Sequence, residues 1–262
     1  MGSCTLSSGG VCVVVVLLCL AACCLTCARG AVPAIYVLGD SQADVGNNNY
    51  LLHSLLKANF PHNGIDYPGG KPTGRFSNGY NFVDLIGDKP MNSSVYLKGV
   101  NFASGGAGAQ CISFDEQIDG DYHRVHEALG KQLGIPGAKA HLAKSLFVVA
   151  IGGNDIINDL LLSPVSELLR SRDEIVSNLE NTLKRQLQVR YKEVKAACCG
   201  LGDNNAMFLC SPASVYCDNR TSYMFWDVVH PTQAAVEKLM KIAFDGSAPL
   251  VSPKNIKQLT ES

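Results

Sequence analysis

The chain has 262 residues, of which 47% are hydrophobic and 17% are charged, and its formal net charge at pH 7 is −1. This length accommodates one large domain or two small ones. A charge balance so close to neutral does not indicate binding to nucleic acid or an anionic membrane, so we expect neither as a partner.

The first thirty residues contain one charged side chain, Arg29, and an apolar run from Val11 to Thr26 that is followed by small residues. This run is shorter than the roughly 20 apolar residues that a membrane-spanning helix needs. We therefore expect residues 1–30 to be a secretory signal peptide, cleaved near Ala28 to Ala31. Residues 31–262 would then form the secreted domain.

Six of the 11 cysteines lie in this leader. The five cysteines beyond it are Cys111, Cys198, Cys199, Cys210 and Cys217. In a secreted chain they predict disulfides with one thiol left over. The last four lack C-x-x-C spacing, which disfavours the alternative of a zinc site. N-glycosylation sequons at Asn92 and Asn219 agree with a secretory route.

Three apolar stretches have the length and composition of buried strands, at residues 35–38, 100–103 and 145–151. Helical spacing predicts helices over 50–57, from 81 onward, and over 114–133, 163–187 and 232–244. Residues 59–76 are rich in Gly, Pro and Asn and predict a long surface loop. In the cysteine-rich residues 189–225 we expect no buried strand. Alternating strands and helices predict an α/β sandwich with a parallel sheet.

Polar or glycine motifs follow each predicted strand. Ser41 comes directly after the turn at Gly39 and Asp40, where a nucleophile would be exposed at the tip of a strand. Gly105 and Gly106 offer backbone N–H groups, and Asn154 offers a side-chain amide, which are donors that stabilise an oxyanion in acyl transfer. Each motif alone also fits a plainer role, as a turn for the serine and the glycines or as a helix N-cap for Asn154.

Asp227 and His230 are the candidate acid–base pair. Three residues apart, they can lie on one helical turn, where the carboxylate holds the imidazole Nδ1–H and leaves Nε2 facing Ser41. A capping pair on the last helix is the alternative. The remaining histidines have no acidic partner in a comparable motif, and we expect them to be structural or on the surface. They are His53, His62, His123, His126 and His141.

Together these motifs resemble one family. Read in order they are GDSQADVGNNN, GRFSNGYNFVDLI, GVNFASGGAG, IGGND, ACCGLG and FWDVVHP, spread over residues 34 to 240. They are similar to the plant-type GDSL esterase/lipase family of SGNH hydrolases. The resemblance implies a three-layer α/β/α sandwich with a parallel sheet, and a Ser-Asp-His hydrolase of acyl, acetyl or lipid esters. It implies neither a metal nor a cofactor.

The resemblance also assigns roles to residues of this chain. Ser41 would be the nucleophile and would contribute its own N–H to the oxyanion hole. A glycine of the Gly105–Gly106 pair, with Gly106 favoured, and Asn154 would be the other donors. His230 would be the base, oriented by Asp227. The mature protein would be a secreted, extracellular monomer of the cell wall or apoplast. Its partner would be an ester substrate, and it would not insert stably into a membrane.

The sequence departs from the family after Gln188, where it runs directly into Val189. Members of the family carry a block there that this chain lacks, roughly two strand–helix units or about 60 residues. We therefore expect a truncated sheet of about three strands, with an apolar edge exposed on the third. This departure leaves an alternative function open, that of a shortened, catalytically weak or inactive family member.

Overall fold

The computed structural model describes residues 32–86, 96–107, 111–154 and 191–261. Its centre is a parallel sheet of three strands, β1 (Ile35–Gly39), β2 (Gly99–Asn101) and β3 (Leu146–Ala150), in the order β2-β1-β3. Val37 of β1 lies opposite Asn101 in β2 and Val148 in β3. The predicted α/β class, the parallel pairing and the three-stranded sheet are confirmed.

One face of the sheet is covered by α2 (His123–Ala143), which continues from a π-helical segment, η3 (Glu116–Tyr122). Tyr36 and Leu38 of β1 pack there against Val125 and Leu129 of α2. The helix predicted over 114–133 is therefore present and extends further than expected. It bends at Gly134, where φ is 71°, so that a proline two residues later is accommodated.

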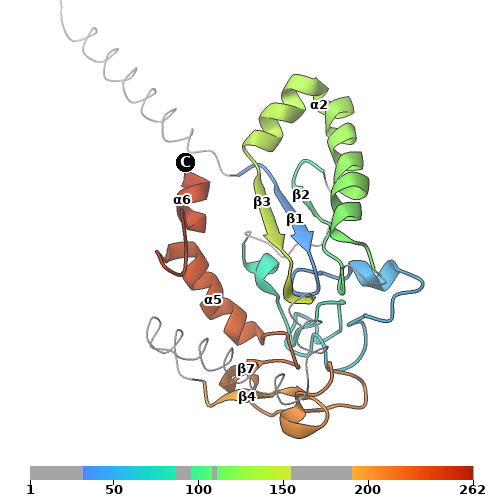
Figure 1. Cartoon of the computed structure of the whole chain (residues 1–262), viewed down its shortest axis with the longest axis vertical. Coiled ribbons are helices and arrows are strands. Elements are labelled where there is room, and N and C mark those ends of the chain that lie inside the picture. Colours follow the sequence, from blue (N-terminus) through green and yellow to red (C-terminus); the bar gives the residue numbers. More distant parts are fainter. Residues whose placement is uncertain (1–31, 87–95, 108–110, 155–190, 262) are drawn as a thin grey trace, which may run out of the picture.

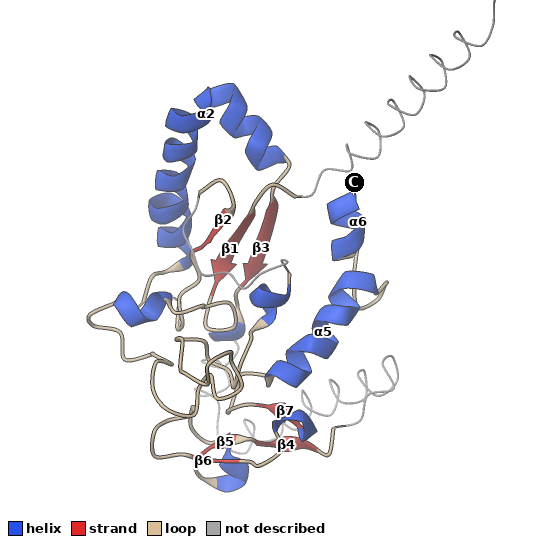
Figure 2. Cartoon of the chain, turned by 180° about the vertical axis from the view of Figure 1, so that it is seen from behind, coloured by secondary structure: helices blue, strands red, loops and turns tan. Residues whose placement is uncertain are grey.

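The opposite face of the sheet buries Val37, Ala43 and Ala103 against Val83 of the short 3-10 helix η2 (Phe82–Leu85). Helix α5 (Gln233–Asp245) contacts η2, and α6 (Ile256–Glu261) contacts α5. Both views show the sheet between α2 on one side and α5 on the other (Figures 1 and 2). The arrangement is the predicted three-layer α/β/α sandwich.

Four short strands lie beyond the carboxyl ends of the central strands (Figure 2). Here β4 (Glu193–Ala197) pairs in parallel with β7 (Tyr223–Phe225), and β5 (Cys199–Gly200) pairs antiparallel with β6 (Val215–Tyr216). The expectation of no buried strand in residues 189–225 is therefore wrong for β5, both residues of which are buried. Most of β4 is only half-buried, so it lacks the continuous apolar run by which a buried strand is recognised.

The cysteines in this region form the disulfides Cys198–Cys217 and Cys199–Cys210, and Cys111 is a free thiol. Two disulfides and one leftover cysteine are what the sequence predicts. The remaining short helices are the 3-10 turns η1 (Asn47–Tyr50), η4 (Asp203–Asn205) and η5 (Arg220–Ser222).

The helix expected over 50–57 is absent, since the chain is irregular after η1. Tyr50, Leu52 and Leu55 are about 90% exposed, so this segment has no buried apolar stripe to stabilise a helix. Other predictions lie outside the described residues, namely the signal peptide, the Asn92 sequon, the 163–187 helix and the junction after Gln188. Among the helices that the structure does describe, none has both the length and the apolar character needed to cross a membrane.

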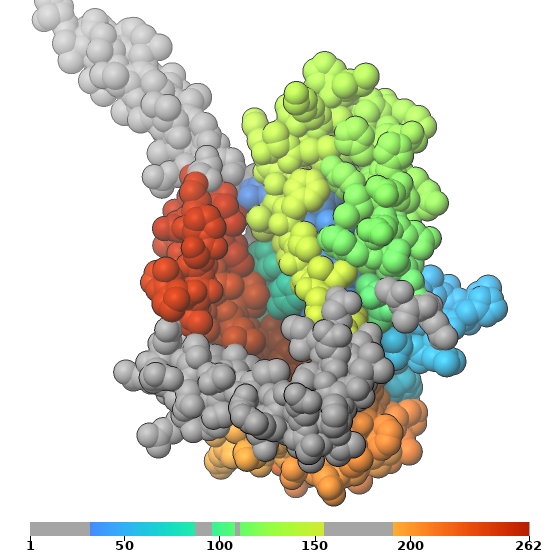
Figure 3. Space-filling model, in the orientation of Figure 1, coloured from blue at the N-terminus to red at the C-terminus, as the bar shows by residue number. Residues whose placement is uncertain are grey.

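Among the described strands, β3 lies at one edge of the central sheet, and its apolar side chains reach the surface. Phe147, Val149 and Ile151 in and directly after β3 are 41%, 57% and 39% exposed, consistent with the expected apolar edge. Figure 3 shows β3 in yellow between green α2 and red α5.

Candidate active site

Ser41 stands on the turn that follows β1, at the carboxyl end of the central strand. A Cβ on Gly39 would collide with the carbonyl oxygen of Ala150, so only glycine allows β1 and β3 to approach this closely. The Asp40 N–H donates to that same carbonyl at 3.0 Å. The turn therefore starts at a fixed point and presents Ser41 beyond the edge of the sheet.

His230 connects Ser41 to Asp227. The His230 Nε2 lies 2.7 Å from Ser41 Oγ, and His230 Nδ1 lies 2.8 and 3.0 Å from the two carboxylate oxygens of Asp227. His230 and Asp227 are 2% and 1% exposed. With the carboxylate accepting the Nδ1 proton, Nε2 is left as an acceptor facing the hydroxyl. The structure therefore places the three side chains that the sequence analysis grouped within hydrogen-bond distance of one another.

Asp227 and His230 do not lie on a helical turn, although their spacing of three residues allows one. Asp227 and His230 occupy a bend between β7 and α5. Asp227 Oδ1 accepts the N–H groups of Val229 and His230 at 3.1 and 3.0 Å, and the Trp226 N–H donates to the His230 carbonyl at 2.7 Å. A carboxylate that bonds the backbone two and three residues on favours a turn over a helix.

The cysteine-rich segment holds this bend in place. The N–H groups of Cys198 and Cys199 donate to the carbonyls of Phe225 and Trp226 at 2.9 and 2.6 Å. The Trp226 side chain is fully buried, and its indole N–H donates to Asn63 Oδ1 at 3.0 Å. One cysteine of each disulfide is therefore hydrogen-bonded to the backbone directly before the bend that carries His230.

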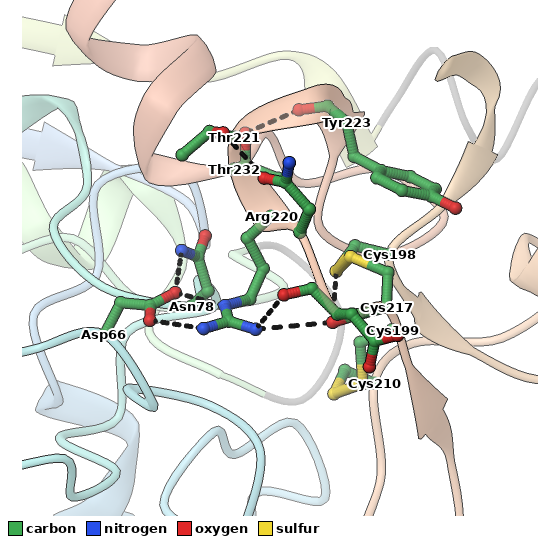
Figure 4. The surroundings of a disulfide bond; sticks show 12 residues. Asp66, Asn78, Cys198, Cys199, Cys210, Cys217, Arg220, Thr221, Tyr223 and Thr232 are labelled. Carbon is green, nitrogen blue, oxygen red and sulfur yellow. Dashed lines mark hydrogen bonds and ion pairs between the residues drawn. A yellow bond between two sulfur atoms is a disulfide. The ribbon is translucent and has the colours of Figure 1, made fainter. Parts of the chain in front are cut away.

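An ion pair joins the same segment to the loop of residues 59–76. Arg220 donates to both carboxylate oxygens of Asp66 at 2.6 and 2.9 Å, and Asn78 adds a hydrogen bond to Asp66 at 2.8 Å (Figure 4). Arg220 also donates to the carbonyl of Cys217 at 3.3 Å. The hydrogen bonds from Arg220 lower the pKa of the Asp66 carboxyl. The loop and the cysteine-rich segment are thereby locked together.

The candidate oxyanion donors differ in their partners. The Gly105 N–H donates to Asp44 Oδ2 at 2.9 Å and is therefore occupied. The N–H groups of Ser41 and Gly106 have no hydrogen-bond partner among the described residues. The Nδ2 of Asn154 is buried and also unpaired within that part of the chain. Gly106 has a φ of 72°, which glycine adopts without strain.

Asparagines that follow Ser41 connect its turn to the turn that carries Gly105 and Gly106. Sequence reasoning did not assign this role to them. Asn47 Nδ2 donates to the carbonyls of Asn101 and Ala103 at 2.9 and 2.8 Å. Asn48 Nδ2 donates to the Gly105 carbonyl at 2.7 Å, and its Oδ1 accepts the Ser104 hydroxyl. The run of three amides in GNNN was the available signal, because short side-chain amides satisfy the backbone groups of turns.

Three further side chains that sequence reasoning missed surround the catalytic groups. Gln117, from the π-helical segment, hydrogen-bonds the backbone of Gly39. The Phe76 ring stacks on the His230 imidazole, with centroids 5.0 Å apart and planes 28° apart. Asp40 is 2% exposed, and this burial raises the pKa of its carboxyl. No spacing in the sequence indicates a role for these three residues, because each role depends on the surroundings of the side chain in the fold.

Comparison with known proteins supports the family resemblance that the motifs indicate. Residues 35–190 match the family model described as GDSL-like Lipase/Acylhydrolase. The Arabidopsis thaliana protein named GDSL esterase/lipase At5g55050 is 29% identical over 343 aligned positions, which cover 88% of this chain and 91% of the relative. A second protein of that plant, GDSL esterase/lipase At5g37690, is 26% identical over 327 positions, covering 84% and 91%. Both alignments are longer than this chain, so parts of each relative have no counterpart here.

Proposed function

Because the chain belongs to the GDSL-like lipase/acylhydrolase family, we propose that it hydrolyses carboxylic esters with Ser41 as the nucleophile. The observation that carries the proposal is the 2.7 Å contact between Ser41 Oγ and His230 Nε2, with Asp227 on the other ring nitrogen. A nucleophile and a base within hydrogen-bond reach, and a third group that orients the base, form the arrangement that acyl transfer requires.

The reaction follows from the position of each group. Ser41 Oγ attacks the ester carbonyl while His230 Nε2 takes the hydroxyl proton, and Asp227 stabilises the imidazolium. The N–H groups of Ser41 and Gly106 and the amide of Asn154 donate to the oxyanion, which their unpaired state supports. The imidazolium then protonates the leaving alcohol. Water, activated by the same histidine, releases the acid from the acyl-enzyme.

We further propose that the protein acts outside the cell as a glycosylated monomer on acyl, acetyl or lipid esters. Two disulfides support an oxidising compartment, because such bonds rarely persist in the cytosol. Asn219 is exposed, as a glycosylated asparagine must be. The Asn92 sequon and the apolar leader of residues 1–30 are sequence arguments for the same location.

A shortened, weakly active form is the second candidate, and two observations favour it. The aligned regions of the relatives exceed the length of this chain. Strand β3 exposes Phe147 and Val149, apolar side chains that a further layer of chain would cover. In that case the catalytic geometry is retained while stability and solubility are reduced.

Turnover of p-nitrophenyl acetate by the purified chain tests the proposal, with Ser41→Ala as the comparison. We expect kcat/KM to fall by at least ~10³-fold in the variant, since only binding and oxyanion stabilisation remain. Equal turnover by a folded Ser41→Ala protein would refute the proposal. A protein with the family block inserted after Gln188 separates the two candidates. A large rise in kcat/KM and in melting temperature would identify the shortened form as the weak one.

A further inference from the structure

We infer that a cavity along α5 receives the unbranched apolar chain of the ester substrate, an inference that rests on the proposed ester hydrolysis. The cavity has a volume of about 240 Å³ and lies between α5 and the segment that includes η2. The described residues that line it are mostly apolar, with Phe82 on one wall and Leu239 on the other, and none of these residues is charged. Such a lining favours a hydrocarbon ligand.

The cavity begins beside the catalytic groups. Gln42, the residue after Ser41, and Pro231, the residue after His230, both line it. Phe76 forms a shared wall, because its ring stacks on the His230 imidazole and also lines the cavity. A substrate carbonyl at Ser41 would therefore have one apolar recess within reach of its substituents.

Four residues of α5 line the cavity over two turns of the helix. Val236, Leu239, Met240 and Ala243 line it, and their spacing of three, four and seven residues places them on one face of the helix. From Val236 to Ala243 the helix rises about 10 Å. Helix α5 starts near the site and runs away from the carboxyl ends of the central strands (Figure 1). Val236 is thus nearer the catalytic pair, and Ala243 is at the far end.

These dimensions suit a short linear chain. The volume is below the ~300 Å³ at which pockets for drug-sized ligands begin, so a bulky ring system would not fit. Each methylene that enters the cavity should raise kcat/KM roughly fourfold until the recess is full. Both the acyl chain and the alcohol of an ester can supply this hydrocarbon, and the experiment distinguishes these two sources.

The test uses the full chain and phenylalanine substitutions at graded depth. Val236→Phe fills the near part of the cavity, and Ala243→Phe fills the far end. Lys241→Phe, on the exposed face of the same helix, is the matched control. The acyl series is the p-nitrophenyl esters from acetate to octanoate. The alcohol series is the acetate esters from ethanol to 1-octanol, with acetate release measured.

We expect the wild type and Lys241→Phe to prefer longer chains in one of the two series. In Val236→Phe the loss of kcat/KM should grow with chain length and reach at least tenfold for the eight-carbon member. In Ala243→Phe, kcat/KM should fall only for the longest esters of that series. The series that responds identifies the occupant. An unchanged chain-length profile in both series for both variants, with a raised melting temperature, would show a packing void and overturn the inference.

Binding of octanoate and 1-octanol, measured by calorimetry, separates this inference from the proposed function because it needs no turnover. We expect at least one of the two to bind the wild type and Lys241→Phe, and to bind Val236→Phe and Ala243→Phe at least tenfold more weakly. If the wild type hydrolyses no ester but shows this binding pattern, the proposed function fails and the cavity stands. Equal affinity in all four proteins, or no binding to any, would overturn the cavity whatever the activity.

Discussion

Gln117 and Gly39 exchange two hydrogen bonds across 78 residues of sequence. The Gly39 N–H donates to Gln117 Oε1 and Gln117 Nε2 donates to the Gly39 carbonyl, both at 2.8 Å. Gln117 is fully buried and belongs to η3, the π-helical segment that precedes α2. Segments of π-helix are frequent at functional sites. Here the segment places one amide against the residue that starts the nucleophile turn.

Gln117 is therefore expected to position Ser41 without touching substrate. Gln117→Leu removes both bonds and a third one, from Nε2 to the Ile112 carbonyl at 3.2 Å, so unfolding free energy should fall by about 1–3 kcal/mol. The displaced turn should also lower kcat by ~10²-fold with little change in KM. Gln132→Leu, an exposed change on α2, should alter neither. A Gln117→Leu protein that loses stability but keeps its kcat would assign the residue a purely structural role.

Asn154 distinguishes an oxyanion donor from a helix cap. Its Nδ2 is buried and unpaired among the described residues, which is costly unless the substrate supplies the acceptor. Asn154→Ala should lower kcat by ~10²-fold, with KM and melting temperature nearly unchanged. Steady-state kinetics and a thermal melt decide between the roles. A stability loss with normal kcat would favour the cap.

The disulfide Cys199–Cys210 is expected to hold the bend that carries the catalytic pair. It closes a loop with a sequence separation of 11, and the Cys199 N–H bonds the carbonyl of Trp226, the residue before Asp227. Replacing both cysteines by serine should reduce unfolding free energy by about 2–3 kcal/mol and lower kcat. Cys111→Ser, at the free thiol, is the control and should leave the melting temperature nearly unchanged. A double variant with wild-type melting temperature would show that the bend holds itself.

The Asp66–Arg220 pair predicts a pH-dependent contribution to stability. Since the folded state lowers the pKa of Asp66 below its ordinary value of 3.8, the pair stabilises the fold above that value. The contribution is lost as pH falls through the lowered pKa. Both side chains are partly exposed, so Asp66→Asn should cost about 1 kcal/mol or less at pH 7. Denaturant melts from pH 7 to pH 3 should show the two proteins converging at the acid end. A constant difference would contradict the assignment.

Local patterns predicted most of the central fold because they coincide with burial. The stretches 35–38, 100–103 and 145–151 are mostly apolar runs ending in glycine or polar turns, and each overlaps a strand of the central sheet, although β2 ends at Asn101. Helix α5 begins after Thr232, which caps it by accepting the Ala235 N–H. For these elements the local preference and the tertiary environment agree.

Where prediction failed, long-range contacts decide the structure. Strand β4 is recognised as a strand only when its pairing with β7 is known. The roles of Gln117 and Phe76 depend on partners 78 and more than 100 residues away, which no spacing reveals. The spacing of Asp227 and His230 predicts a helical turn because an i, i+3 pair fits both a helical turn and a bend. The backbone hydrogen bonds to the Asp227 carboxylate favour the bend.

Activation of Ser41 by His230 is tested most directly by a fluorophosphonate adduct that is mapped by peptide mass spectrometry. We predict one adduct, on the peptide that contains Ser41, formed rapidly by the wild type. It should be absent in Ser41→Ala and at least ~10²-fold slower in His230→Ala, because the base is needed to activate the hydroxyl. Labelling on another residue, or labelling of folded His230→Ala at the wild-type rate, would contradict the account.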